Sequence, residues 1–244
     1  DVDDRYADQV LMPGLVEGHS HLMAGGLWNF PFVGYYARTA PDGKVWEGCR
    51  DFETVVRRLQ EAERALPPGD EPLLAWGFDP IFFGKARMTR QDLDRVSSTR
   101  PIAVLHASQH LMNVNSAMLS RAGIDQDTDI EGVMTFADGE PNGELQEPAA
   151  MFPVVRRVGN AGLLAPMTDE GVAGFAAICR LQGVTTATDL VNDLSDHTMA
   201  ALRESTLRPG YPCRIVPAFN SLYGGLSLED SIARVLQART QGNA

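Results

Sequence analysis

The chain contains 244 residues, of which 44% are hydrophobic and 22% are charged, so it can bury the core of one barrel-sized domain or of two small ones. Its 32 acidic and 21 basic residues give a formal net charge of -11, which argues against nucleic acid as a partner. No stretch approaches the roughly 18 uncharged apolar residues of a membrane-spanning helix, so no membrane association is expected.

The cysteines and the first residues bear on the cellular location. Cys49, Cys179 and Cys213 are odd in number and lack paired spacing, which argues against a disulfide framework and against a cysteine zinc site. The first five residues form neither a basic leader nor an apolar signal core. Together these features predict a cytoplasmic protein.

An apolar run at residues 10–16 leads through Glu17 into two closely spaced histidines, His19 and His21. The run predicts a buried strand, and its polar end is the first candidate site. Side chains two residues apart on a strand point to the same face, so both imidazoles can converge on one cation. Imidazole is a natural ligand of zinc and similar metals. By itself, a His-x-His pair also fits two structural histidines at the surface or in the core.

The middle of the chain is predicted to alternate strands and helices. The spacing of apolar residues predicts a helix over residues 52–66, which ends at Pro67-Pro68-Gly69. The next predicted elements are a strand at 73–78, a brief helix after Thr89, a strand at 102–106, a helix from Asn115 to Gly123 and a hairpin at 132–145.

The last third alternates most clearly. Its predicted elements are a helix from Thr168 to Gly183, a strand at 184–190, a helix at 199–207, a strand at 213–219 and a helix from Ser227. Such alternation is typical of a parallel sheet. About five strands of the parallel type are expected, whereas a closed (β/α) barrel needs eight.

Five motifs carry a resemblance to a known family. Residues 10–22 resemble the first barrel strand of the amidohydrolase superfamily, which reads apolar-Met-Pro-Gly-apolar-apolar-acid-x-His-x-His. Residues 88–94, 110–119 and 143–149 follow in the order seen in the family 3 amidohydrolases, the group of N-substituted formamide deformylases and D-aminoacylase relatives. Gly183-Val184-Thr185-Thr186 continues the similarity, so it extends over most of the chain.

The resemblance implies an α/β fold of the metal-dependent hydrolase (β/α) TIM-type barrel, present as an incomplete portion. Residues 1–9 are then the remnant of an N-terminal β-sandwich, and residues 10–244 are the first part of the barrel, with a hairpin insertion near 132–147. The family's remaining ligands, two histidines and an aspartate, are expected beyond residue 244. The general base is expected there too, so no catalytic residue is assigned in this chain.

The resemblance also suggests site residues. His19, His21 and Glu147 are the expected metal ligands, with Glu147 as a bridging ligand at the end of a strand. Its rival Glu144 is expected to face the opposite side, and the alternative for Glu147 is a solvent-facing carboxylate at a hairpin end.

Three residues are candidates for binding substrate. His110 precedes the family's Asn-Ser motif, Asp79 follows the strand at 73–78, and Trp28 belongs to an aromatic stretch after the histidine pair. The alternatives are a turn-stabilising role for Asp79 and ordinary packing for Trp28. His106 is expected to be a buried histidine at a strand end, and His197 a surface residue of a helix.

The expected activity is hydrolysis of an amide-like, non-peptide C–N bond in a small molecule by metal-activated water. The cofactor is a divalent metal, with zinc expected and one or two ions bound. The alternative is a non-catalytic fragment or pseudoenzyme that retains the barrel fold. The substrate cannot be identified from the sequence, and a homo-oligomer is left open.

Overall fold

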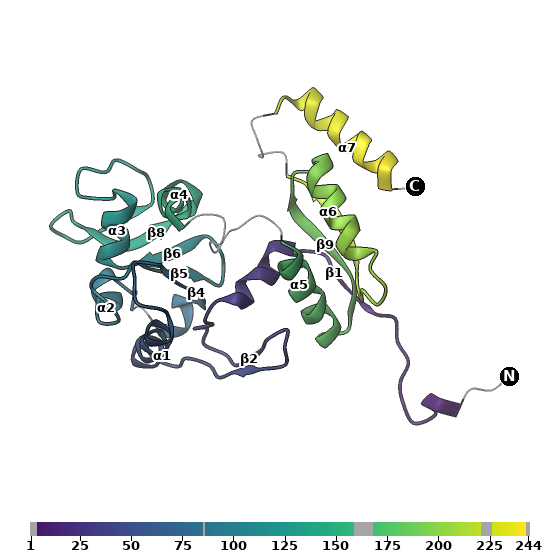
Figure 1. The fold of residues 1–244 in the computed structure, drawn as a ribbon, viewed down its shortest axis with the longest axis horizontal. Helices are drawn as coiled ribbons and strands as arrows, with labels where there is room; N and C mark the ends of the chain where they lie inside the picture. Colours follow the sequence, from purple (N-terminus) through teal and green to yellow (C-terminus); the bar gives the residue numbers. More distant parts are fainter. Residues whose placement is uncertain (1–3, 85, 159–167, 221–225, 243–244) are drawn as a thin grey trace. The chain divides into compact units, whose positions relative to one another are not determined.

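The computed structural model describes residues 4–84, 86–158, 168–220 and 226–242. The chain divides into two compact units (Figure 1). The terminal unit comprises Asp1–Gly25 and Met167–Ala244, and the central unit comprises Gly26–Pro166. Of the described helices, none is long and apolar enough to cross a membrane.

The central unit is built on a five-stranded mixed sheet with the order β4-β5-β6-β8-β7. Strands β4 and β5 are parallel, and the other neighbouring pairs are antiparallel. The strands are β4 (Leu73–Phe78), β5 (Ile102–His106), β6 (Leu111–Val114), β7 (Val133–Thr135) and β8 (Pro141–Gln146), and a separate ribbon pairs β2 (Arg38–Thr39) with β3 (Val45–Trp46). The helices are α1 (Phe52–Ala65), α2 (Arg90–Asp94), α3 (Ser116–Ala122), α4 (Glu147–Val158) and the 3-10 helix η3 (Pro80–Phe83).

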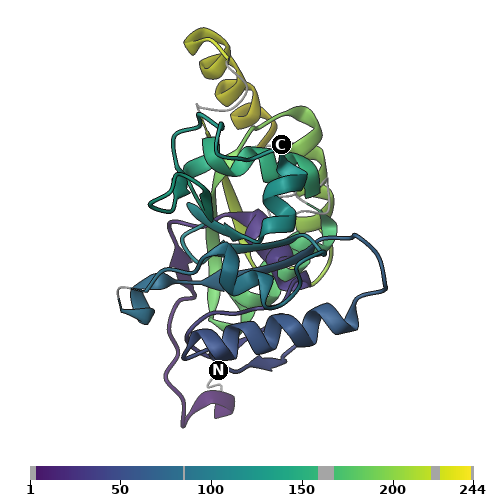
Figure 2. The ribbon, with the colours of Figure 1, turned by 90° about the vertical axis from the view of Figure 1, so that its left-hand side faces the viewer.

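Helix α1 forms where the sequence predicts it. Its first turn is capped by Asp51, whose carboxylate accepts the Thr54 N–H at 2.7 Å, and the helix ends just before Pro67. Figure 2 shows α1, in blue, running along one face of the five-stranded sheet. Strands β4 and β5 are buried along almost their whole length, which explains their continuous apolar sequence. The core on the α1 side consists of Val33, Cys49, Val55, Leu59, Leu73, Ala75, Phe78, Met88, Leu93, Ile102 and Val104.

Several predicted local signals are confirmed in this unit. The Asn115 side chain accepts the Met118 N–H and caps α3, which ends at Gly123 in the left-handed conformation. The Thr89 N–H donates to the Asp92 carboxylate at the start of α2. The predicted hairpin is formed by β7 and β8, with Gly139 at a φ of 87° in its turn.

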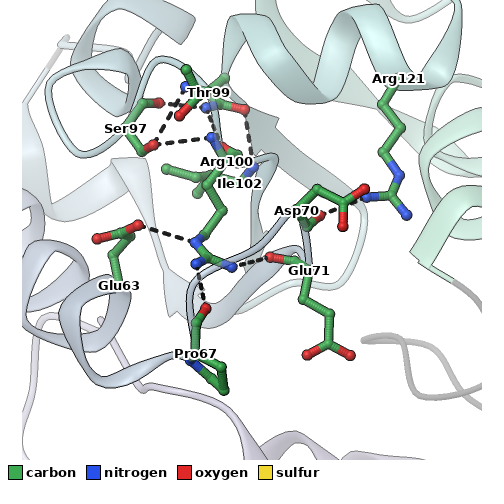
Figure 3. Close-up of polar contacts among 10 residues, drawn as sticks. Glu63, Pro67, Asp70, Glu71, Ser97, Thr99, Arg100, Ile102 and Arg121 are labelled. Carbon is green, nitrogen blue, oxygen red and sulfur yellow. Dashed lines mark hydrogen bonds and ion pairs between the residues drawn. The ribbon is translucent and has the colours of Figure 1, made fainter.

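A buried guanidinium ties the end of α1 to the sheet (Figure 3). Arg100 is only 5% exposed and lies just before β5. Its Nε donates to Glu63 at 3.0 Å, and its two terminal nitrogens donate to the carbonyl oxygens of Glu71 and Pro67 at 2.7 Å each. Three chain segments are therefore fixed by one side chain whose charge is paired.

The terminal unit contains a three-stranded parallel sheet with the order β1-β9-β10. Its elements are η1 (Asp4–Tyr6), β1 (Leu15–Glu17), η2 (Leu22–Asn29, which continues into the central unit), α5 (Asp169–Leu181), β9 (Val184–Asn192), α6 (Asp196–Thr206), β10 (Arg214–Phe219) and α7 (Leu228–Gly242). Helices α5 and α6 share a core with η2 and β10, in which Leu22, Val172 and Leu202 are buried. The predicted ends of α5 are confirmed. The Thr168 hydroxyl accepts the Gly171 N–H and caps the start of the helix, and Gly183, just after its end, has a φ of 70°.

Two predictions about the strands are wrong. Residues 10–16 do not form a buried strand, because only Leu15–Glu17 is a strand, and it is exposed. Strand β1 pairs with β9 on one side only and lies at the sheet edge, so its apolar side chains stay uncovered. The five parallel-type strands also do not form one sheet, since β4 and β5 belong to the sheet of the central unit, where β5 pairs with β6 in antiparallel orientation. The described residues do not show a TIM-type barrel, which therefore remains a prediction.

The described part of the predicted β-sandwich remnant, residues 4–9, contains the short helix η1 and no strand. Residues 1–3 lie outside the described residues. The boundary at residue 9 stays a prediction.

Candidate metal centre

The two histidines of the His-x-His motif lie directly after the C-terminal end of β1. His19 is exposed and His21 is partly buried. Their ring centroids are 5.6 Å apart, with the rings nearly perpendicular at 83°. An ion bound at about 2.0–2.1 Å to one nitrogen of each ring would place the centroids roughly 5–6 Å apart. The pair therefore fits a shared metal ion.

Backbone and side-chain hydrogen bonds hold this segment against β9. The Glu17 carboxylate accepts the His19 N–H at 2.9 Å. Between the histidines, the Ser20 hydroxyl donates to the Thr188 carbonyl oxygen, and the Ser20 carbonyl accepts the Leu190 N–H at 3.0 Å. The Ser20 hydroxyl therefore bonds to β9, and the two imidazoles are the candidate metal-binding groups of this motif.

Within the described ranges, no three His, Cys, Asp or Glu side chains come together in a group that could hold a metal ion. His19 and His21 remain the two candidate ligands of the terminal unit. The expectation that other ligands of the family follow residue 244 stays a prediction.

The structure pairs two other predicted site residues, both in the central unit. His110 Nδ1 lies 2.9 Å from a carboxylate oxygen of Glu147, and the Glu147 N–H donates to the His110 carbonyl at 2.8 Å. Both side chains are about two-thirds exposed, at 64% and 66%. Glu147 was predicted to lie at the end of a strand. In the structure β8 ends at Gln146, and Glu147 is the next residue and the first of α4. Its role as a metal ligand is still a prediction.

Glu147 has an unusual backbone. Its φ of 65° lies in the left-handed region, which is uncommon for a residue with a side chain. The two hydrogen bonds with His110 hold the residue in this conformation. Backbone strain of this kind often accompanies functional sites, so His110 and Glu147 remain candidate functional residues.

Asp79 and Trp28 take the structural roles that were their alternatives. The Asp79 carboxylate accepts the Ile81 N–H at 3.1 Å and caps η3. The Trp28 ring lies 4.9 Å from the Trp76 ring and 5.9 Å from the Phe32 ring, measured between centroids. Contacts of either residue with a substrate remain predictions. His197 lies exposed on α6, as the sequence predicts.

His106 is a buried histidine at the end of β5, as expected. It is 2% exposed, and its Nε2 lies 2.5 Å from the side-chain oxygen of Asn113. The Asn113 amide nitrogen donates to the Met88 carbonyl, so the oxygen faces His106 as an acceptor. Burial lowers the pKa of His106 below its usual value, and the ring is neutral in the folded chain near pH 7.

Glu144 is a buried carboxylate that the sequence did not place in a role. Arg87 donates two hydrogen bonds to it, one of them at 2.8 Å, and Gln146 donates a third at 2.6 Å. Burial acts to raise the pKa of Glu144, but the hydrogen bonds from Arg87 and Gln146 outweigh it and hold the pKa below its ordinary value. Glu144 is therefore a paired structural carboxylate whose side chain is 4% exposed, whereas the Glu147 side chain is 66% exposed.

The buried imidazole of His106 predicts a specific pH dependence of stability. Its folded-state pKa is lowered from 6.5, so below that pH the unfolded chain binds more protons and the free energy of unfolding falls. The stability conferred by Glu144 is lost only as the pH falls below 4.5, so the range from about pH 7 to about pH 5 isolates His106.

The three tryptophans, Trp28, Trp46 and Trp76, all lie in the central unit, so tryptophan fluorescence reports its unfolding in urea. We expect the wild-type chain to lose stability between these pH values and His106→Gln to show a flatter dependence. The control His197→Ala, at an exposed position on α6, should keep the wild-type slope. An unchanged slope in His106→Gln would refute the assignment.

One residue near the motif was missed at the level of sequence. Asp189 lies in β9, is 4% exposed, and accepts the Leu22 N–H next to His21 at 3.2 Å. Asp189 is the one charged residue of β9, and a buried carboxylate is costly, so this was the signal available in the sequence. Its partner lies 167 positions away in the chain, so the contact itself could not be read from spacing.

Imidazole is a common ligand of zinc, so a His-x-His pair at the end of a parallel strand is a candidate for metal binding. The model of the amidohydrolase family (Amidohydro_3) matches residues 7–243. The chain belongs to this family of hydrolases.

Similar proteins agree with this assignment. The chain is 31% identical over 176 residues to YtcJ of Bacillus subtilis, a provisionally named amidohydrolase, covering 68% of this chain and 31% of that protein. It is 26% identical over 187 residues to LONG AFTER FAR-RED 3 of Arabidopsis thaliana, covering 75% of this chain and 29% of that protein. The chain thus spans about a third of the length of the curated relatives it matches.

Among solved structures, the chain is similar to an uncharacterized metal-dependent hydrolase from Pyrococcus horikoshii, with a TM-score of 0.49 and 15% identity. The similarity covers 85% of this chain and 36% of that structure. The family assignment rests on the match of the family model over residues 7–243.

Proposed function

We propose that the protein hydrolyses an amide-like, non-peptide C–N bond of a small molecule with the help of a divalent metal ion, zinc being the first choice. The observation that carries this proposal is the His19–His21 pair, whose centroid separation of 5.6 Å suits two ligands of one ion, in a chain of the amidohydrolase family. The substrate group of N-substituted formamides is a further, finer expectation from the sequence resemblance.

Each residue has a defined part in this proposal. His19 and His21 bind the ion, and the hydrogen bonds of Ser20 to β9 keep the two rings at a fixed spacing. When bound, the metal lowers the pKa of a water molecule and polarises the carbonyl group that is attacked. The general base and further ligands are proposed to lie beyond residue 244, where the family places them.

Glu147 is proposed as an additional oxygen ligand and His110 as the residue that orients it. A ligating carboxylate is commonly held by a second hydrogen bond, and His110 supplies one at 2.9 Å. His110 is also a candidate for contact with substrate. These roles are proposed independently of metal binding by His19 and His21. If either role proved wrong, the proposal for the two histidines would still stand.

The proposal is tested by amine release from a panel of N-formyl and N-acyl compounds. Protein stripped with a chelator should be inactive, and addition of Zn²⁺ should restore hydrolysis. The non-catalytic alternative predicts no hydrolysis of any compound in the panel whether or not zinc is bound. Metal bound in sub-stoichiometric amounts together with that inactivity would overturn the proposed function.

A further inference from the structure

Asp189 lies on β9 directly beside the histidine motif. Both of its carboxylate oxygens accept hydrogen bonds from uncharged donors: Oδ1 from the Leu22 N–H at 3.2 Å and Oδ2 from the Asn192 side-chain amide at 2.9 Å. The side chain is 4% exposed. Burying a carboxylate is unfavourable unless it is hydrogen-bonded, so these two bonds account for how the fold tolerates it and raise the question of what it does.

The bond to Leu22 fixes the chain on the far side of His21. Before His21, Ser20 is bound to β9 through its hydroxyl and its carbonyl. After it, Leu22 is bound by Asp189, and the Leu22 side chain is buried in the core with Val172. The backbone of His21 is therefore anchored at both neighbouring residues, which sets the direction in which its imidazole leaves the chain.

Asn192 determines the orientation of the Asp189 carboxylate. The Asn192 side-chain oxygen accepts the Leu194 N–H at 2.8 Å, so its amide nitrogen must face Asp189. The site consequently requires two acceptor atoms at position 189. An aspartate supplies both, whereas an asparagine supplies one and would turn its own amide group toward the Asn192 amide.

We propose that Asp189 is a positioning residue that holds His21, through the Leu22 N–H, in the geometry needed for metal binding. This inference rests on the proposed function, because it assumes that His19 and His21 bind a metal ion. Groups that orient metal-binding histidines commonly change metal affinity by about 10- to 100-fold when they are removed. Asp189 acts here through the backbone and does not itself touch the ion.

The test measures the Zn²⁺ dissociation constant of the protein by competition with a chromophoric chelator, and the visible spectrum of the Co²⁺ form. Asp189→Ala should weaken Zn²⁺ binding by about 10- to 100-fold and alter the Co²⁺ spectrum, because the His21 ring loses its fixed direction. Asp189→Asn should give a smaller loss, since it keeps an acceptor for the Leu22 N–H. The matched control is Ser205→Ala, which removes a buried hydrogen bond to Asp169 in the same unit and should leave both readouts unchanged.

The variants distinguish failure of this inference from failure of the proposed function. If His19→Ala/His21→Ala lost zinc while Asp189→Ala bound it with wild-type affinity and spectrum, Asp189 would have no positioning role. Equal weakening by Ser205→Ala would also contradict it, because general destabilisation would then explain the effect. If the double histidine variant bound zinc like the wild type, the proposed function itself would be wrong. Should Asp189→Ala not fold, Asp189→Asn and Ser20→Ala carry the same test, with a measurable loss of affinity expected in both.

Discussion

Replacement of both motif histidines, His19→Ala/His21→Ala, is expected to reduce zinc uptake to the background level and to abolish hydrolysis. The two imidazoles are the metal ligands proposed for this segment, and the double change removes both of them, so the ion loses its attachment to the segment after β1. Stability should change little, because His19 is exposed and the segment is held by Ser20 and Asp189. Metal content is measured on the purified protein by elemental analysis.

The control for this experiment is His197→Ala. His197 lies exposed on α6 in the same unit, so it matches the residue type without belonging to the motif. We expect this variant to bind zinc and to act like the wild type. Zinc content that survived the double change would show that the ligands lie elsewhere.

Replacement of Arg100 by methionine is expected to have the largest effect on stability. The change leaves the buried side of Glu63 and the carbonyl oxygens of Glu71 and Pro67 without their donor (Figure 3). The Glu63 side chain is 27% exposed, so the main cost comes from the two carbonyl oxygens, and a buried acceptor left without its donor commonly costs about 1–3 kcal/mol. Unfolding of the central unit, followed by tryptophan fluorescence in urea, should therefore shift to a much lower midpoint.

Arg121→Met is the matched control for this prediction. Arg121 is exposed and donates to the Asp70 carbonyl oxygen in the same region, as Figure 3 shows. Exposed contacts of this kind contribute little to stability, so the control should unfold close to the wild-type midpoint. Equal midpoints for Arg100→Met and the wild type would refute the role given to Arg100.

Local features of the fold were predictable where residues signal both the element and its end. The predicted bounds of β4 and β5 agree with the structure because apolar runs are long enough and turn residues flank them. Asn115 and Gly123 mark the ends of α3 by their capping chemistry, which depends on residues only a few positions away.

Features that depend on distant parts of the chain were not predictable. Strand β6 (Leu111–Val114) was missed because it is short and includes the polar Asn113, and its identity depends on antiparallel pairing with β5 and β8. Residues 10–16 were expected to be buried because they are apolar, but burial requires covering elements, and β1 is an edge strand. Sequence composition does not show which strand lies at an edge.

The candidate site divides in the same way. The spacing of His19 and His21 is local, so their neighbouring positions after a strand followed from the motif. The pairing of His110 with Glu147 and the contact of Asp189 with Leu22 join segments that are far apart in sequence. The signals for such residues are weaker: a single charged residue in a strand, as for Asp189, or a charged residue next to a motif.

The most direct test of the central claim is anomalous diffraction at the zinc absorption edge from crystals of the protein grown with Zn²⁺. We predict a dominant zinc peak at about 2.0–2.1 Å from one nitrogen of each of the His19 and His21 rings. A dominant peak at another position, such as the exposed His110–Glu147 pair, with no anomalous signal between His19 and His21, would contradict the account.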